Sequence, residues 1–324
     1  MYPAFDEVLS RGTASASKLS GLVNEILGAC NQQAKESDGM NRATQSQITS
    51  TSFDSLIPLS VVRIGIMNLS YELLNNEFLY FAHRGASAHE PENTLLSVEK
   101  ALSLGASWIE IDLFVVENTL IVIHDETLER TTNGVGYVME HSVDYLRSLD
   151  AGKGEPIPLL QEIFDLVNGR AGLNIEIKSA QCAPLLTQMI EHYVATTDWT
   201  YDHIIVSSSI YNELRNVRML QPALKIGAIM DAYDSSSKRL LKTLNVFSMH
   251  VDHTEVSPKL VQKAHQSNLK VFVYTVNNFM ERDLMKSMGV DGIFTDYPEL
   301  AYDNIDTTLE YADSHTLPVL ARTL

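Results

Sequence analysis

The stretch FLYFAHRGASAHEPENTLLSVEKALSLGASWIEIDL, residues 78–113, contains the pattern that decides the fold. A short apolar run of the β type, FLYFAH, is followed by the helical pattern TLLSVEKALSLG and then by a second β-type run, WIEIDL. A strand, a helix and a strand in this order predict two parallel strands joined by a right-handed crossover.

The same alternation continues along the chain as far as DGIFTD at residues 291–296. An extra β-type run, TLIVIHD, follows the second strand at once and predicts a hairpin. Eight strand–helix units within residues 77–303 fit a (β/α)8 TIM barrel, a fold of about 250 residues. An open doubly wound sheet is less favoured, because no G-x-G-x-x-G follows the first strand and polar residues stand at the ends of many strands.

The predicted fold class is therefore α/β, a TIM barrel over residues 77–303 with an extra hairpin strand after strand two. Residues 1–76 are rich in Ser, Thr, Asn and Gln, and such a tract buries too little apolar surface to order itself. We expect it to form a poorly ordered extension with one amphipathic helix in SASKLSGLVNEILGAC, residues 15–30. Residues 304–324 are expected to form a C-terminal tail.

Composition limits the classes of partner and compartment. The net charge of −17 argues against broad nucleic-acid binding, although a small phosphate-bearing substrate needs only a local positive cluster. Cys30 and Cys182 are too few for a disulfide framework. The first residues, MYPAFDEVLSRG, do not resemble a secretory signal, and the apolar stretch at 55–67 is too short to span a bilayer. We expect a cytoplasmic protein without stable membrane insertion.

Charged side chains stand at the carboxyl ends of the first two predicted strands, where a TIM barrel collects its chemistry. Strand one stops at His83 and Arg84, and strand two ends in the run that contains Glu110 and Asp112. Because side chains alternate along a strand, the two carboxylates point to the same side. They repel each other unless a cation lies between them; a partly solvated pair of barrel acids is the alternative.

The next strands bring further polar groups to the same end of the barrel. The hairpin strand ends at His124, and strand three, NIEIK, carries Asn174, Glu176 and Lys178 on one face. A single histidine at a strand end is more often structural than catalytic. Here a structural cause would have to recur on three neighbouring strands, so a common site is favoured.

The proposed ligand set consists of oxygen donors. Glu110, Asp112 and Glu176, without cysteine, suit a hard divalent cation, Mg²⁺ or Ca²⁺. Zinc bound by histidine is the alternative. A carboxylate set leaves His83 and His124 free for proton transfer, for which an ordinary pKa of about 6.5 is useful.

Two basic residues complete the predicted site. Arg84 offers a planar fork that matches phosphate oxygens, and Lys178 offers a point charge. A divalent cation with an arginine and a lysine stabilises charge on the nonbridging oxygens of a phosphoryl group. The residues therefore predict a site for phosphate chemistry on a small phosphodiester.

In order along the chain, seven short motifs together resemble the glycerophosphodiester phosphodiesterase family and span most of residues 78–303. They are HRGASAHEPENT (83–94), EID (110–112), HDETLERTTNG (124–134), IPLLQE (157–162), NIEIK (174–178), YTVN (274–277) and GVDGIFTDYP (289–298).

The resemblance implies a (β/α)8 fold and the metal-dependent hydrolysis of a glycerophosphodiester to glycerol 3-phosphate and an alcohol. It also implies roles for the residues named above. The two histidines would be the general acid and base, the three carboxylates would bind one divalent cation, and the arginine and lysine would contact phosphate. Tyr274 stands where the family usually has tryptophan, so it would form an aromatic wall for the substrate with an added hydroxyl. Asn93 is expected to cap the first helix.

Two other functions compete with this one. A lysophospholipase D-like phosphodiesterase acting on lysolipids would use the same residues, with a wide apolar approach assisted by the stretch at 55–67. A non-catalytic barrel that binds phosphodiesters or a protein partner would be expected to lack a histidine or a metal carboxylate, whereas this chain keeps them all. The sequence does not predict an oligomeric state.

Overall fold

The computed structural model of the protein describes residues 78–230, 233 and 235–302. The expectations for the extension 1–76, with its amphipathic helix and the apolar stretch at 55–67, lie outside the described residues. The same holds for the C-terminal tail 304–324.

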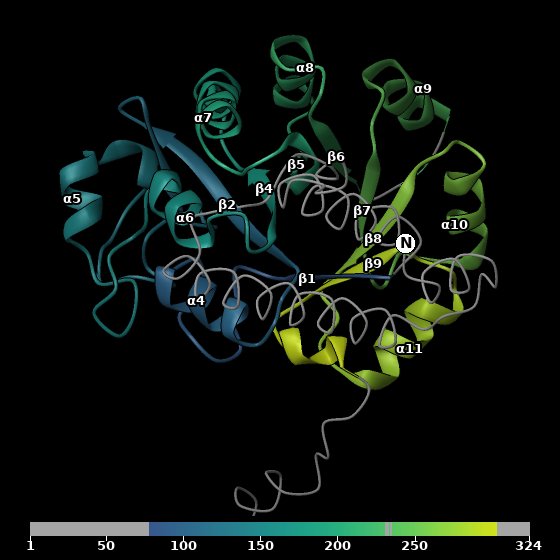
Figure 1. Ribbon diagram of the computed structural model, residues 1–324, viewed down its shortest axis with the longest axis horizontal. Helices are drawn as coiled ribbons and strands as arrows, with labels where there is room; N and C mark the ends of the chain where they lie inside the picture. Colours follow the sequence, from purple (N-terminus) through teal and green to yellow (C-terminus); the bar gives the residue numbers. More distant parts are fainter. Residues whose placement is uncertain (1–77, 231–232, 234, 303–324) are drawn as a thin grey trace, which may run out of the picture. The chain divides into compact units, whose positions relative to one another are not determined.

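The strands of the described residues close into a parallel barrel (Figure 1). β1 pairs in parallel with both β2 and β9, which closes the ring, so the predicted (β/α)8 fold is confirmed. The barrel strands in chain order are β1 (Leu79–Ala82), β2 (Trp108–Val116), β4 (Gly172–Ile177), β5 (Ile204–Ser208), β6 (Lys225–Ile229), β7 (Ser248–Asp252), β8 (Lys270–Tyr274) and β9 (Gly292–Thr295).

The predicted hairpin strand is also present. β3 (Thr119–Val122) runs antiparallel to the second half of β2. The turn between them consists of Glu117 and Asn118, with φ of 48° and 60°, the left-handed conformation that a tight hairpin turn requires. The prediction that strand two ends with the run WIEIDL, residues 108–113, is wrong, because the apolar residues that follow extend the strand to Val116 and pair with β3.

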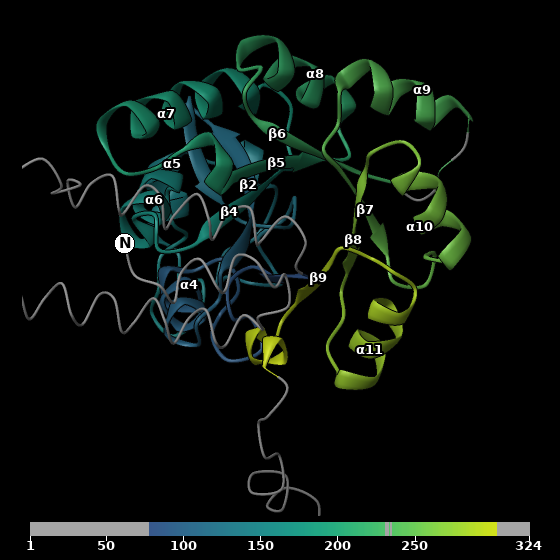
Figure 2. The ribbon, with the colours of Figure 1, turned by 45° about the vertical axis from the view of Figure 1, so that its right-hand side comes forward.

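The helices lie around the outside of the barrel, as the two ribbon views show (Figure 1, Figure 2). Ile109 and Ile111 of β2 are fully buried in the core between strands and helices, as strand alternation predicts. The helical elements are α4 (Leu95–Ser103), η1 (Val138–Glu140), α5 (Val143–Ser148), α6 (Leu160–Val167), α7 (Cys182–Thr196), η2 (Tyr201–His203), α8 (Tyr211–Leu220), α9 (Ser235–Leu244), α10 (Pro258–His265), α11 (Phe279–Ser287) and η3 (Pro298–Ala301).

Aromatic side chains fill the interior of the barrel. The ring of Phe81 stacks on Phe294 with centroids 4.6 Å apart, and it lies 4.9 Å from Phe272 and 5.6 Å from Trp108. All four are buried. The barrel is therefore a packed core, and the space at one end of it is a pocket with a floor rather than a channel.

The start of α4 differs from the prediction. Thr94, not Asn93, is the N-cap: its hydroxyl accepts a hydrogen bond from the Ser97 amide at 3.1 Å, and Ser97 Oγ accepts one from the Thr94 amide. Asn93 has a φ of 57° and directs its amide toward β2, where Nδ2 donates to Asp112 Oδ2 at 2.8 Å. The expectation that Asn93 caps the helix is wrong; it instead holds a carboxylate.

A substitution at the β1–β9 pair, which closes the barrel, tests how tightly the two strands pack. Gly292 opposes Leu79 across the β1–β9 pair, and a Cβ atom at Gly292 would lie 2.5 Å from the Leu79 carbonyl oxygen. We expect Gly292→Ala to lower the free energy of unfolding by about 1–3 kcal/mol, because backbone must move. Denaturant unfolding would measure this, with Ser287→Ala on the exposed end of α11 as control. Equal stability of Gly292→Ala and the parent protein would contradict this packing.

Candidate active site

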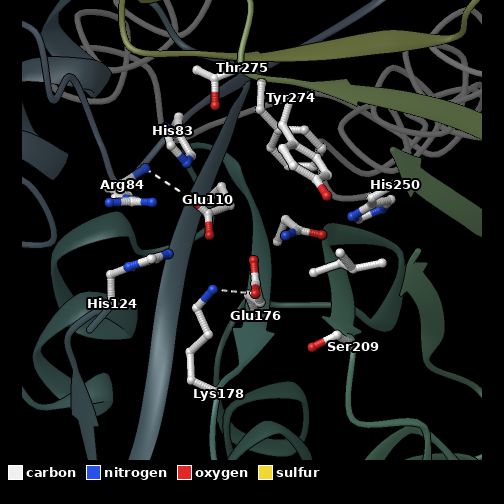
Figure 3. A pocket seen from close by; sticks show the side chains of 13 residues that line it. His83, Arg84, Glu110, His124, Glu176, Lys178, Ser209, His250, Tyr274 and Thr275 are labelled. Atoms are coloured by element: carbon white, nitrogen blue, oxygen red, sulfur yellow. Dashed lines mark hydrogen bonds and ion pairs between the residues drawn. The ribbon is translucent and has the colours of Figure 1, made fainter. Parts of the chain in front are cut away.

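A pocket of about 290 Å³ opens at the end of the barrel where the parallel strands finish. In Figure 3 the charged side chains lie on one side of it, and Tyr274, His250 and Ser209 lie on the other. The residues that line it are His83, Arg84, Glu110, His124, Asn174, Glu176, Lys178, Ser209, Ile229, His250, Tyr274, Thr275 and Phe294.

His83 is held by an aspartate from the far end of the chain. It follows β1, and its Nδ1 lies 2.7 Å from Asp296 Oδ1, just beyond β9. Asp296 also accepts hydrogen bonds from Ser87 Oγ at 2.9 Å and from Asn277 Nδ2 at 2.6 Å. Burial opposes the charge on Asp296, but these donors outweigh it and lower the pKa of the carboxyl to about 2. Asp296 therefore stays ionised and orients the imidazole.

His124 has a matching arrangement within its own loop. Its Nδ1 lies 2.5 Å from Asp125 Oδ1. Hydrogen bonds from Arg130 and His124 outweigh partial burial and hold the pKa of Asp125 well below its usual value. Burial lowers the pKa of His124, and nearby Lys178 adds to this effect while Asp112 opposes it. Because an ionised carboxylate only accepts, Nδ1 carries the proton in both histidine–aspartate pairs, which leaves each Nε2 available.

Three carboxylates meet at the inner wall. Glu110, Asp112 and Glu176 each place an oxygen within 4.8 Å of the others. Their spacing follows from the β2–β4 register, in which Asp112 pairs with Glu176. Glu110 is 2% exposed; its Oε2 accepts a hydrogen bond from the Arg84 amide at 2.9 Å, whereas its Oε1 is buried without a partner.

The crowding separates the proton affinities of the three acids. Burial, together with Asp112 and Glu176, raises the pKa of Glu110 well above its ordinary value. Burial and the charge of Asp112 also raise the pKa of Glu176. Burial opposes ionisation of Asp112 as well, but Lys178 and Arg84 outweigh it and lower the pKa of that group. Asp112 is thus the permanently charged member of the cluster.

This donor set fits a divalent cation. The buried, unpartnered Oε1 of Glu110 needs a positive partner, and three carboxylates without a thiolate suit Mg²⁺ or Ca²⁺ better than a soft metal. A cation would also remove the repulsion that raises the pKa of Glu110 and Glu176.

The two basic residues lie against the carboxylates. Arg84 has a φ of 55°, and its Nη1 donates to Glu92 Oε1 at 2.7 Å while its Nε lies 3.4 Å from Asp112. Lys178 Nζ forms an ion pair with Glu176 and lies 3.3 Å from Asp112 Oδ1. Burial opposes their charge, but the surrounding acids raise the pKa of both, so two fixed positive charges border the pocket.

The opposite wall is neutral. Tyr274, predicted from its motif, lines it together with His250, which sequence reasoning did not single out. His250 Nε2 lies 2.9 Å from Ser248 Oγ, and burial lowers the pKa of His250 to about 3, so the ring is uncharged at neutral pH. The sequence feature that could have identified His250 is its position in VFSMHVD, where it lies on the inward-facing side of strand β7.

The structure gathers all of the predicted site residues around this pocket, with Asp112 buried directly behind the lining. Residues 83–300 match the model of the Glycerophosphoryl diester phosphodiesterase family. The chain belongs to this family. It is therefore an enzyme of the glycerophosphodiester phosphodiesterase class, as the motifs predicted.

Curated relatives and solved structures agree with this family. A glycerophosphodiester phosphodiesterase of Caldanaerobacter subterraneus subsp. tengcongensis is 36% identical over 233 residues, which cover 68% of this chain and 95% of the relative. One of Bacillus subtilis is 30% identical over 270 residues, 76% and 92% of the two chains. The structure of an Oleispira antarctica phosphodiesterase in complex with the product sn-glycerol-3-phosphate aligns with a TM-score of 0.62 at 30% identity, covering 68% of this chain and 94% of that one.

None of the helices in the described part of the chain has both the length and the apolar character that crossing a bilayer requires. The cytoplasmic location and the absence of nucleic-acid binding stay predictions.

The Asp296–His83 pair gives a pH-dependent prediction. The folded-state pKa of Asp296 is about 2, below its ordinary 3.8, so the ionised group stabilises the fold above pH 3.8 and loses this effect as the pH falls toward 2. Asp296→Asn should therefore be less stable than the parent protein at pH 5. The difference should shrink by roughly half at pH 3. Urea unfolding at the two pH values measures it, and an equal difference at both would contradict the depressed pKa.

Proposed function

We propose that this protein hydrolyses glycerophosphodiesters to glycerol 3-phosphate and an alcohol, with a divalent cation and with His83 and His124 as the acid and base. One observation carries the proposal: two imidazoles, each held through Nδ1 by an aspartate, face the same pocket as a cluster of three carboxylates. The related phosphodiesterase solved with sn-glycerol-3-phosphate supports this choice of product.

Substrate binding is assigned to the charged side of the pocket. The fork of Arg84 and the ammonium of Lys178 would bind the nonbridging oxygens of the phosphodiester, since both stay positively charged beside the acids. A cation held by Glu110, Asp112 and Glu176 would supply further positive charge to those oxygens. Tyr274, on the neutral wall, would pack against the glycerol or the alcohol.

Proton transfer is assigned to the two Nε2 atoms. One histidine removes the proton from the attacking oxygen, which belongs to water or to the substrate's own glycerol hydroxyl, and the other protonates the oxygen of the departing alcohol. Where the glycerol hydroxyl attacks, a cyclic phosphate forms, and water then opens it to glycerol 3-phosphate. Expulsion of an unprotonated alkoxide at neutral pH is slow, and a positioned acid contributes about 10²–10⁴-fold. The aspartates at Nδ1 stabilise the imidazolium that forms and keep Nε2 pointed at the substrate.

The competing functions have less support. The lysophospholipase D-like alternative needs a wide apolar approach to the mouth, whereas most residues that line the described pocket are polar or charged; the stretch at 55–67 lies outside the described residues. The non-catalytic alternative does not account for two aspartate-bound histidines beside a carboxylate cluster.

Release of glycerol 3-phosphate from a panel of glycerophosphodiesters, with and without chelator, tests the proposal. His83→Ala and His124→Ala should each lower kcat by at least about 10²-fold with the fold intact by circular dichroism. His265→Ala serves as control, because His265 pairs with Asp291 outside the pocket. Near-normal turnover in either site variant, or full activity with chelator, would refute this mechanism.

Cation binding should be linked to proton release. The pKa values of Glu110 and Glu176 are raised, so these groups retain protons at a pH where ordinary glutamates are charged, and a cation must displace them. Calorimetric titration with Mg²⁺ or Ca²⁺ should therefore show affinity that increases with pH and a release of protons to the buffer. Glu110→Gln should weaken binding. An affinity independent of pH, or an unchanged affinity in Glu110→Gln, would contradict the assigned ligands.

A further inference from the structure

Arg130 bridges two carboxylates just outside the pocket. Its Nε donates to Asp125 Oδ2 at 2.5 Å, and its Nη2 donates to Asp125 Oδ1 at 2.9 Å. Its Nη1 and Nη2 donate to the two oxygens of Glu92 at 2.6 and 2.8 Å. Both contacts are bidentate, which fixes the orientation of the guanidinium and of the two acids. Arg130 itself does not line the pocket.

Each of these carboxylates holds one residue of the site. Asp125 lies 2.5 Å from Nδ1 of His124, and Glu92 accepts a hydrogen bond from Nη1 of Arg84 at 2.7 Å. His124 follows β3 and Arg84 follows β1, so two residues from separate strands are joined through one guanidinium. The chain of contacts runs from an imidazole assigned to proton transfer to an arginine assigned to phosphate.

The network affects the charge of the site as well as stability. The Arg130 side chain is 46% exposed, where an isolated ion pair contributes little, but two bidentate pairs in one network contribute more. Its effect on charge is more specific. Glu92 lies between Arg84 and Arg130. Burial raises the pKa of Glu92, but the hydrogen bond from Arg130, followed by the charge and the hydrogen bond of Arg84, outweighs burial and lowers this pKa. Two guanidinium groups share Glu92, so this carboxylate neutralises less of the charge of Arg84, whose Nε also lies 3.4 Å from Asp112.

We propose that Arg130 is a positioning residue that acts on both halves of the reaction. Through Asp125 it keeps the proton of neutral His124 on Nδ1, with Nε2 toward the substrate. Through Glu92 it limits how far that carboxylate neutralises Arg84, so that the fork of Arg84 stays available to phosphate. This inference rests on the proposed function for its kinetic consequences, and its structural part is independent of that function.

Kinetics of glycerophosphocholine hydrolysis with Mg²⁺ test the two effects separately. Arg130→Ala should lower kcat/KM by about 10–100-fold, as loss of a group that orients an active-site residue typically does. We expect a lower kcat through Asp125 and a higher KM through Glu92. Glu92→Gln removes the charge at position 92 that partly neutralises Arg84. In this background Arg130→Ala should therefore cause little further change in KM.

Two comparisons separate positioning from a general loss of stability. Free guanidinium at low, non-denaturing concentration should restore part of the activity of Arg130→Ala, and Arg130→Lys should stay impaired because one ammonium cannot form four hydrogen bonds. Arg147→Ala is the matched control: Arg147 binds Glu162 through two hydrogen bonds in the same β3–α6 segment but does not reach the pocket. Its kcat and KM should be unchanged.

A measurement without turnover completes the test. ¹⁵N NMR of the His124 imidazole, assigned with His124→Ala, should show the Nδ1–H form in the parent protein and a mixture of tautomers in Arg130→Ala. Unchanged kinetics and an unchanged spectrum in Arg130→Ala would overturn the inference. If the parent protein hydrolyses no glycerophosphodiester, the proposed function fails, while the imidazole spectrum still decides whether Arg130 positions His124.

Discussion

The pairing of the buried Asp112 carboxylate with positive and polar partners is the interaction on which the site depends. Asp112 is 1% exposed, and Arg84, Lys178 and Asn93 lie 3.4, 3.3 and 2.8 Å from its oxygens. An uncompensated charge at this depth would cost several kcal/mol. The partners come from two segments of the chain, the β1–α4 connection and the end of β4. Their convergence on Asp112 places an arginine and a lysine beside Glu110, and we propose that this arrangement prepares the mouth of the barrel for a phosphate and a cation.

Barrel geometry determines which side chains can meet there. Alternation along β2 turns Glu110 and Asp112 inward, and the parallel register with β4 sets Asn174 and Glu176 beside them. The aromatic layer around Phe81 closes the barrel below and keeps the site shallow. The same arrangement leaves the acids close together. Burial and mutual repulsion therefore raise the pKa of Glu110 and Glu176, and a bound cation would relieve this repulsion.

Much of this could be predicted from the sequence because strand periodicity and strand ends are local features. The residues after β1, within β2 and within β4 were assigned to one site on that basis, and the fold and family are confirmed. The partners that orient them were not predicted. Asp296 is 213 positions from His83, so only the closure of β1 on β9 brings them together. Asn93 was assigned to a helix cap because its neighbour Thr94, which is the cap, offers the same kind of local signal.

We propose that Glu110, Asp112 and Glu176 bind one cation, on the side of the pocket where Arg84 and Lys178 would hold a phosphate. Anomalous diffraction from crystals grown with Mn²⁺ and glycerol 3-phosphate tests it most directly. We expect one manganese peak bonded to oxygens of all three acids, with the phosphate of the ligand in contact with Arg84 and Lys178. A manganese peak elsewhere, or phosphate bound away from these residues, would contradict it.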